Sequence, residues 1–379
     1  MSKILFIQVA LPWFRVPLFM TLAKDFEIDY YLLNKSEVEG IYEIDSSEHD
    51  DYERLNVISG SFSYLSLVKQ LRNGKYDIVV LPAMDNFRII GFNIVIVILS
   101  FFFNFKKVYF SLEWFSEKYN ELTPLVKKVY RKIKEAVVGL VLQKINHIIA
   151  IGSRPFQHLL NLGVNKSVLY MSPNVSEITE DGGIDVQQLK ESLSIPNNAK
   201  VILYLGRIIE RKGLSILIEA FLNTVVNNAF LVVAGGGDLR YIEKCKALAS
   251  SSENIKFAGK VMPINRCSFF EMADIFVLPS IPIDNNMEPW GLTVNEAFQM
   301  NTPVITSDCV GAAFDMIEQG VTGYVYSAYN ISQLREYIDI LLANEEHAVQ
   351  VAQNARACFE NQFSYKQMHM VFARVFNNC

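Results

Sequence analysis

The chain has 379 residues, of which 51% are hydrophobic and 20% charged, and its formal net charge is −5. This length allows two domains with separate cores, and the negative balance argues against a general nucleic-acid binder. The cysteines and histidines are scattered without metal-ligand spacing, which indicates reduced thiols in a cytoplasmic protein and no zinc site. The apolar start predicts a buried strand rather than a signal peptide, because no small-residue cleavage site follows and Arg15 interrupts the run.

The first half of the chain alternates apolar strands with helices. Strands are predicted at 4–9, 27–33, 76–81, 107–112 and 146–153. Helices are predicted at 16–23, 64–72, 89–105, 123–142 and 154–162. The acidic stretch 34–56 predicts a solvated loop. Strands separated by helices in this way are typical of an α/β fold with a parallel sheet.

Two of these helices are candidates for membrane contact. The helix at 89–105 is the most apolar run of the chain, but about 17 residues fall short of the ~20 that a membrane span needs. We expect a buried, partly lipid-facing helix there, with a membrane span as the alternative. The helix at 123–142 is amphipathic, and its first half carries Lys127, Lys128, Arg131, Lys132 and Lys134. This pattern predicts docking on an anionic membrane surface, and an ordinary solvated face is the alternative.

Glu113 and Trp114 directly follow the strand at 107–112. Ligands of open α/β sheets gather at the carboxyl ends of the strands, which makes this position a candidate site. A carboxylate at a strand end with no chemistry is the alternative. Further along, the polar stretch 177–183, with its glycine pair, predicts the hinge that leads into the second half.

The second half repeats the same rhythm of strands and helices. Strands are predicted at 201–205, 230–234, 255–257, 273–279 and 302–306. Helices are predicted at 186–193, 332–358 and 364–377, with others beginning after Gly213 and at Thr293. The glycine run 235–237 follows a strand and permits close backbone approach. Its spacing is not that of a dinucleotide-binding fingerprint.

Arg207 leaves the end of a strand, and Lys212 precedes the start of a helix. Both cations would converge with the amides of the helix end on one diphosphate. Two solvated loop charges are the alternative.

The stretch 284–306, DNNMEPWGLTVNEAFQMNTPVIT, carries two carboxylates. Glu288 lies on a loop, and Glu296 lies one turn inside the helix that follows, where Thr293 would be the N-cap of a capping box. The amides of Gly291, Leu292 and Thr293 would point between the carboxylates. Amides receive phosphate and carboxylates accept hydrogen bonds from hydroxyls, so the pattern predicts a site for an anionic ligand that carries hydroxyls. A capping glutamate and an unrelated loop glutamate are the alternative.

These segments together resemble a known family. The stretch EPWGLTVNEAF, the PVITSD strand after it, the GYVY segment and the GRIIERKG segment are similar to those of family four retaining glycosyltransferases of the GT-B fold. The resemblance implies two facing Rossmann-like domains with a central cleft. It implies an acceptor-binding domain at 1–178, a nucleotide-sugar domain at 184–358, and a C-terminal helix at 359–379 that packs on the first domain.

The resemblance also assigns roles to residues. Glu288 would contact the transferred sugar and Glu296 the ribose, while Arg207 and Lys212 would neutralise the donor diphosphate. The main chain at Gly206, Gly235, Gly237 and Val261 would lie along the nucleotide. Arg15 would lie near the acceptor or the diphosphate, with a surface arginine that begins a helix as the alternative, and Trp114 would lie on the acceptor side. Glu113 stands where many relatives have a histidine, and it would take the acceptor proton or support the sugar hydroxyls.

The expected function is a retaining transfer of sugar from a UDP-sugar or GDP-sugar, without a divalent metal or other cofactor. The acceptor would be a glycan or lipid-linked glycan in bacterial surface polysaccharide synthesis, on the cytoplasmic face of the membrane. Two alternatives are a nucleotide-sugar epimerase or hydrolase of the same fold, and a non-catalytic partner subunit that binds nucleotide sugar.

Overall fold

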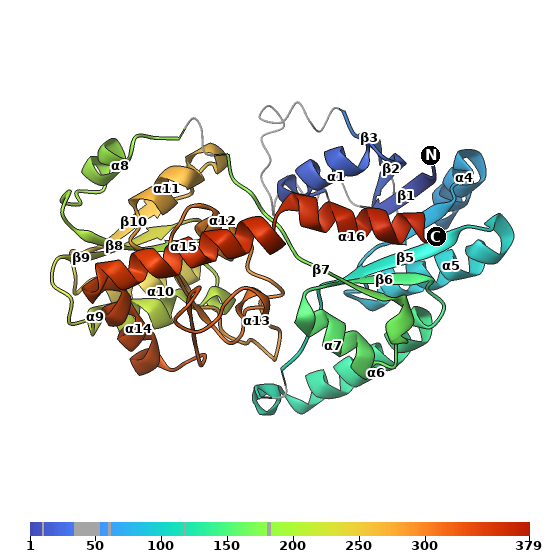
Figure 1. The fold of residues 1–379 in the computed structure, drawn as a ribbon. Helices are drawn as coiled ribbons and strands as arrows, with labels where there is room; N and C mark the ends of the chain where they lie inside the picture. Colours follow the sequence, from blue (N-terminus) through green and yellow to red (C-terminus); the bar gives the residue numbers. More distant parts are fainter. Residues whose placement is uncertain (10, 34–53, 60–61, 117, 180–182) are drawn as a thin grey trace. The chain divides into compact units, whose positions relative to one another are not determined.

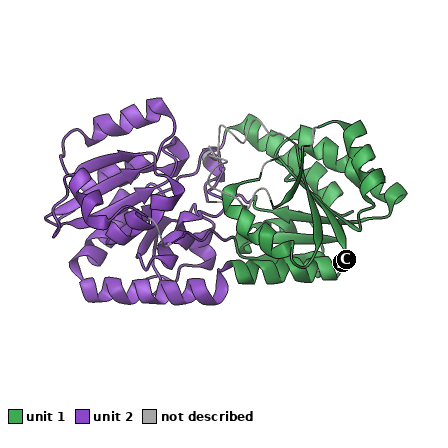
Figure 2. Ribbon diagram, turned by 90° about the horizontal axis from the view of Figure 1, so that it is seen from above, with its two compact units in different colours: residues 1–113, 124–174, 365–379 green, residues 114–123, 175–364 purple. Residues whose placement is uncertain are grey.

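The computed structural model describes all residues except 10, 34–53, 60–61, 117 and 180–182. The chain divides into two compact units, green and purple in Figure 2. The first unit comprises residues 1–113, 124–174 and 365–379. The second unit comprises residues 114–123 and 175–364. Most of the predicted loop at 34–56, and residues 180–182 of the predicted hinge at 177–183, therefore lie outside the described residues.

The first unit is built on a seven-stranded parallel sheet with the order β3-β2-β1-β4-β5-β6-β7 (Figure 1). Both faces of a parallel sheet are covered by helices, so its strands are nearly continuous apolar runs, as the burial of β1 shows. The strands are β1 Lys3–Gln8, β2 Glu27–Leu32, β3 Asn56–Ser59, β4 Ile78–Leu81, β5 Lys106–Ser111, β6 His147–Ile151 and β7 Leu169–Ser172. The helices are η1 Trp13–Arg15, α1 Val16–Leu22, α4 Tyr64–Gly74, α5 Phe87–Phe103, α6 Leu125–Leu142, α7 Ser153–Asn161, η3 Lys166–Val168 and α16 Tyr365–Asn377.

The second unit has a six-stranded parallel sheet with the order β10-β9-β8-β11-β12-β13. Its strands are β8 Lys200–Leu205, β9 Ala229–Ala234, β10 Ile255–Gly259, β11 Ile275–Leu278, β12 Val304–Ser307 and β13 Tyr324–Tyr326. Its longer helices are α8 Val186–Ser192, α9 Leu214–Leu222, α10 Leu239–Ala249, α11 Arg266–Met272, α12 Thr293–Gln299, α14 Ile331–Ala343 and α15 Glu345–Gln362. Its short helices are η2 Asn120–Leu122, η4 Glu210–Lys212, η5 Pro263–Asn265 and α13 Ala312–Asp315.

Some elements of the structure were not predicted. They include the short strands β3, β7 and β13 and the helices α10 and α11. The single helix expected at 332–358 is two helices, because the side chain of Asn344 accepts a hydrogen bond from the His347 amide and caps α15.

The C-terminal helix α16 belongs to the first unit, which begins again at Tyr365 rather than at residue 359. The Tyr365 hydroxyl donates to the Phe14 carbonyl over 2.5 Å, and the rings of Phe26 and Phe376 meet edge to face. Arg15 is buried at the same contact, with Nη1 3.2 Å from the sulfur of Met368. The helix thus completes the covering of the first sheet.

Candidate functional site

A buried ion cluster lies at the carboxyl end of β8, where η4 meets the loop before α12. The Glu288 carboxylate accepts a hydrogen bond from Arg211 Nη1 over 2.7 Å and lies 3.0 Å from Lys212 Nζ. Arg211 Nη1 also donates to the Met287 carbonyl over 3.2 Å. Glu288 is only 8% exposed and Lys212 9%, so the charges of this cluster interact with little screening by water.

Burial and the neighbouring charges set the protonation of this cluster. Burial alone would raise the pKa of Glu288, but the positive charges of Lys212, Arg211 and Arg207 hold that pKa below its usual value. Burial lowers the pKa of Lys212, and the like charges of Arg211 and Arg207 lower it further while Glu288 raises it. Glu288 is therefore an ionised carboxylate at neutral pH, and it faces an excess of positive charge.

Two glycines allow the loops of the cluster to approach. Gly213, just after Lys212, has φ +67°, and a Cβ there would lie 1.9 Å from the Pro279 carbonyl oxygen. Gly291 has φ +90°, and a Cβ there would meet two neighbouring side chains at 2.7 Å. Only glycine accommodates both constraints without strain. The positions of Lys212 and Glu288 thus depend on these turns.

Glu296 lies on α12 and is 1% exposed. One oxygen accepts a hydrogen bond from Ser176 Oγ over 2.9 Å. The other pairs with the guanidinium of Arg266, whose Nε lies 3.1 Å away and whose Nη2 lies closer still. The carboxylate to which the family resemblance gives the ribose role is therefore held in place by a cation.

The capping box predicted at the start of α12 is wrong. Leu292 occupies the N-cap position with helical backbone angles and makes no side-chain cap hydrogen bond. Within the described part of the chain, the Thr293 hydroxyl is buried without a partner. The Glu296 side chain, which a capping box needs, is engaged by Arg266 and Ser176 instead, so tertiary contacts override the local motif.

The predicted nucleotide-side glycines lie where the loops after β8 and β9 meet. A Cβ on Gly235 would lie 1.9 Å from the Gly206 carbonyl oxygen, and one on Gly237 would lie 2.2 Å from that of Ile208. Gly235 and Gly237 are thus required for the approach of the two loops, whereas the space around Gly206 is open. Arg207 is exposed beside them, and Val261 follows β10 in a half-buried position.

In the first unit, Glu113 pairs with Lys134 over 2.6 Å. Lys134 is 7% exposed, so the prediction that it faces a membrane is wrong: the lysine lies on the buried side of α6, where Glu113 attracts it. Arg131 lies 3.9 Å from Glu135 on the same helix. Lys127 and Lys132 are exposed and Lys128 is half-buried. Glu113 is therefore ion-paired at the end of β5.

Trp114 is placed differently from the prediction. It belongs to the second unit, where it is buried against Met287, Cys309 and Ala328. The sequence reading had put this residue in the first domain.

Sequence reasoning missed Arg211 and Arg266. Arg211 stands between two predicted site residues in the charged segment ERKG, and that clustering was the available signal. Arg266 carried no local signal, because its partner is 30 residues away in sequence.

Comparisons with known proteins concern the family and the fold. Residues 185–357 match the family described as glycosyl transferases, group 1. An uncharacterized glycosyltransferase of Methanocaldococcus jannaschii is 28% identical over 178 residues, which cover 46% of this chain and 44% of that protein. Phosphatidyl-myo-inositol mannosyltransferase of Mycobacterium leprae is 28% identical over 170 residues, 43% of each. The chain thus matches less than half the length of these relatives.

Solved structures are similar over the whole chain. HepE of Anabaena in complex with UDP has a TM-score of 0.79 at 16% identity, and the match covers 100% of both chains. WaaG, a glycosyltransferase involved in lipopolysaccharide biosynthesis, has a TM-score of 0.68 at 16% identity, over 98% of this chain and 99% of that one.

Two parallel-sheet α/β units with these structural neighbours define a protein of the GT-B glycosyltransferase fold. Residues 185–357, somewhat less than half of the chain, are similar to the group 1 glycosyltransferase family. The prediction of two α/β domains with parallel sheets of the GT-B fold is thereby confirmed, and the predicted resemblance to glycosyltransferases is matched over residues 185–357.

Proposed function

We propose that the protein is a retaining, metal-independent glycosyltransferase. It moves a sugar from a nucleoside-diphosphate sugar to a hydroxyl of a glycan or lipid-linked glycan in bacterial surface polysaccharide synthesis. The observation that carries the proposal is the buried cluster of Arg211, Lys212 and Glu288 beside the exposed Arg207. A structural neighbour supports a nucleotide-sugar donor, since HepE of Anabaena is solved with UDP and with UDP-glucose.

The chemistry follows from the charges. Departure of a nucleoside diphosphate leaves negative charge on its outer phosphate, and prearranged cations lower the barrier where that charge develops. Lys212 and Arg207 supply this positive charge without a metal ion. When phosphate oxygens bind these cations, the ionised Glu288 is released to accept hydrogen bonds from sugar hydroxyls. Glu296 would bind the ribose once its contact with Arg266 opens.

The names of relatives support the acceptor class. Matching proteins include a capsular polysaccharide biosynthesis glycosyltransferase of Staphylococcus aureus and a lipopolysaccharide 1,2-N-acetylglucosaminetransferase of Salmonella typhimurium. We propose that Glu113, held by Lys134, and Arg15 serve the acceptor, as the resemblance implies. Both belong to the first unit, outside the part of the chain that the family match covers.

We also propose peripheral contact with an anionic membrane. Exposed apolar residues form a stripe on α5, at Ile94, Ile98, Phe101 and Phe102, and a second stripe on α6, at Leu125, Val126, Val129, Tyr130 and Ile133. The two helices pack together, and the rings of Phe87 and Tyr130 lie 5.3 Å apart. Lys127 and Lys132 are exposed on α6, and cations beside exposed apolar groups favour an anionic lipid surface. Of the helices in the described ranges, none has the combined length and hydropathy of a membrane-spanning segment.

A donor panel tests the proposed reaction. The purified protein is incubated in EDTA with UDP-glucose, UDP-galactose, UDP-N-acetylglucosamine and GDP-mannose, with and without a lipid-linked glycan extract. Transfer with retained anomeric configuration is expected from one donor. Epimer or free sugar formed equally well without acceptor would identify an epimerase or hydrolase, and binding without turnover would favour a non-catalytic subunit. Turnover that disappears in EDTA and returns with metal would contradict metal independence.

A further inference from the structure

Residues 114–123, here called the strap, connect β5 and α6 of the first unit yet form part of the second unit. Within the second unit, the strap contacts the loops that follow β12 and β13. Its contacts there are of two kinds, a polar network around Asp308 and an apolar cluster around Met287. All of the contacts considered below lie within the second unit.

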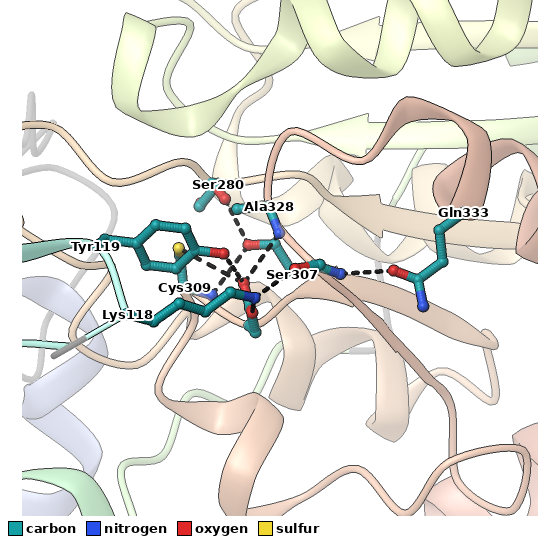
Figure 3. Close-up of polar contacts among 9 residues, drawn as sticks. Lys118, Tyr119, Ser280, Ser307, Cys309, Ala328 and Gln333 are labelled. Atoms are coloured by element: carbon teal, nitrogen blue, oxygen red, sulfur yellow. Dashed lines mark hydrogen bonds and ion pairs between the residues drawn. The ribbon is translucent and has the colours of Figure 1, made fainter. Parts of the chain in front are cut away.

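Asp308 is the centre of the polar network, whose members Lys118, Tyr119 and Ala328 are labelled in Figure 3. Its Oδ1 accepts a hydrogen bond from the Tyr119 hydroxyl over 2.7 Å and another from the Ala328 amide over 2.9 Å. Its Oδ2 lies 2.5 Å from Lys118 Nζ, and the same ammonium donates to Ser327 Oγ. Two neighbouring strap residues therefore hold the loops after β12 and β13 together.

The apolar cluster joins the strap to the loop that carries Glu288. Trp114 and Tyr119 pack with Met287, Cys309 and Ala328. Met287 is 1% exposed, and it immediately precedes Glu288 in the chain. The strap therefore covers one end of the loop on which the proposed sugar-binding carboxylate stands.

Backbone hydrogen bonds fix Glu288 to the segment that the strap grips. The Glu288 amide donates to the Cys309 carbonyl over 2.9 Å, and the Gly311 amide donates to the Glu288 carbonyl over 3.0 Å. A further strap contact runs from the Ser116 amide to Asn285 Oδ1 over 3.3 Å. The strap thus contacts both segments that pair through the backbone at Glu288, namely 285–288 and 308–311.

We propose that the strap positions Glu288 for the donor sugar, with Tyr119 and Lys118 as the positioning residues. This inference rests on the proposed function for the role of Glu288, but the order of the 285–288 loop is measurable without any ligand. Removing one hydrogen bond to a carboxylate raises the equilibrium constant for local opening about tenfold to hundredfold. Loss of the strap contacts should therefore loosen this loop while the sheet below it stays closed.

The first test is amide hydrogen exchange on the full chain without ligand. Tyr119→Phe removes only the hydroxyl, Lys118→Met removes the ion pair, and Lys118→Arg preserves a cation. Tyr130→Phe, an exposed tyrosine on α6, is the matched control. Exchange in the peptide covering 285–288 should rise about tenfold or more in Tyr119→Phe and Lys118→Met, with β8 and β11 unchanged. Exchange equal to wild type, or a rise spread evenly over the second unit, would overturn the positioning role.

The second test uses UDP and UDP-glucose as probes. Because Glu288 is less well ordered in Tyr119→Phe, the affinity of this variant for UDP-glucose should fall about tenfold relative to its affinity for UDP. The affinities of Lys118→Arg should equal those of wild type. If wild-type protein binds the sugar nucleotide no better than UDP, and Glu288→Gln changes nothing, the proposed function is at fault. The strap is then judged on exchange alone. If Glu288→Gln weakens UDP-glucose but the strap variants do not, the strap proposal is wrong.

Discussion

Replacement of Glu288 by glutamine should destabilise the second unit strongly. The variant keeps the size of the side chain but removes the negative charge that faces Arg211 and Lys212. All three side chains are at least four-fifths buried. Breaking a buried ion pair by removing one partner costs about 3–5 kcal/mol, because the remaining charge stays buried without compensation. We expect a loss in this range in the free energy of unfolding.

The loss can be measured in the second unit alone. Two of the three tryptophans, Trp114 and Trp290, lie in that unit, so urea unfolding in a Trp13→Phe background reports on it through fluorescence. The matched control is Glu360→Gln, which removes the surface partner of Arg356. The Glu360 side chain is 56% exposed, and exposed pairs contribute about 0–1 kcal/mol.

Unfolding in the presence of UDP tests whether the effect is specific to the proposed site. In Glu288→Gln, the two cations lack their counter-ion, so UDP should raise the unfolding midpoint of the variant more than that of wild type. A variant as stable as the Glu360→Gln control would refute the account of a buried, charge-coupled cluster. Equal stabilisation of both proteins by UDP would show that the diphosphate does not replace the carboxylate at these cations.

Three further predictions concern other parts of the chain. Lys212→Ala should raise the barrier of transfer by about 2–4 kcal/mol, the scale for one charge-stabilising donor, and steady-state kinetics that match wild type would remove Lys212 from the site. Burial and the nearby charges of Lys134 and Arg131 lower the pKa of His158 to about 4. The free energy of unfolding should therefore keep its full contribution from neutral His158 above pH 6.5, and it should decline by roughly 3 kcal/mol as the pH falls toward 4. A His158 resonance that titrates near 6.5 would contradict this. The double variant Phe101→Asp, Phe102→Asp should lose binding to vesicles of anionic phosphatidylglycerol, while Leu239→Asp, at an exposed leucine on α10, should bind normally; equal binding by both would exclude the α5 stripe as the docking surface.

The architecture was predictable because short stretches of sequence indicate its strands and helices. The strands of both sheets are apolar runs between turn residues, and long buried strands such as β1 and β9 leave little choice of structure. Lys212 and Glu288 were singled out from segments with a nearby glycine turn, and the structure brings the two side chains to 3.0 Å from each other.

Partnerships between distant residues were not predictable from the sequence. The Arg266 contact with Glu296 and the buried pairing of Lys134 with Glu113 each depend on tertiary packing. The first displaced the expected capping box, and the second removed a lysine from the expected basic surface. The strap shows the same limit more strongly, because Tyr119 and Asp308 are 189 positions apart. No local pattern records such a contact.

The most direct test of the donor site is a crystal structure of the protein grown with a UDP-sugar. We predict the diphosphate within hydrogen-bond distance of Lys212 and Arg207, the ribose at Glu296, and the sugar hydroxyls at Glu288. A nucleotide bound away from these cations, with both carboxylates still engaged as in the free protein, would contradict the account.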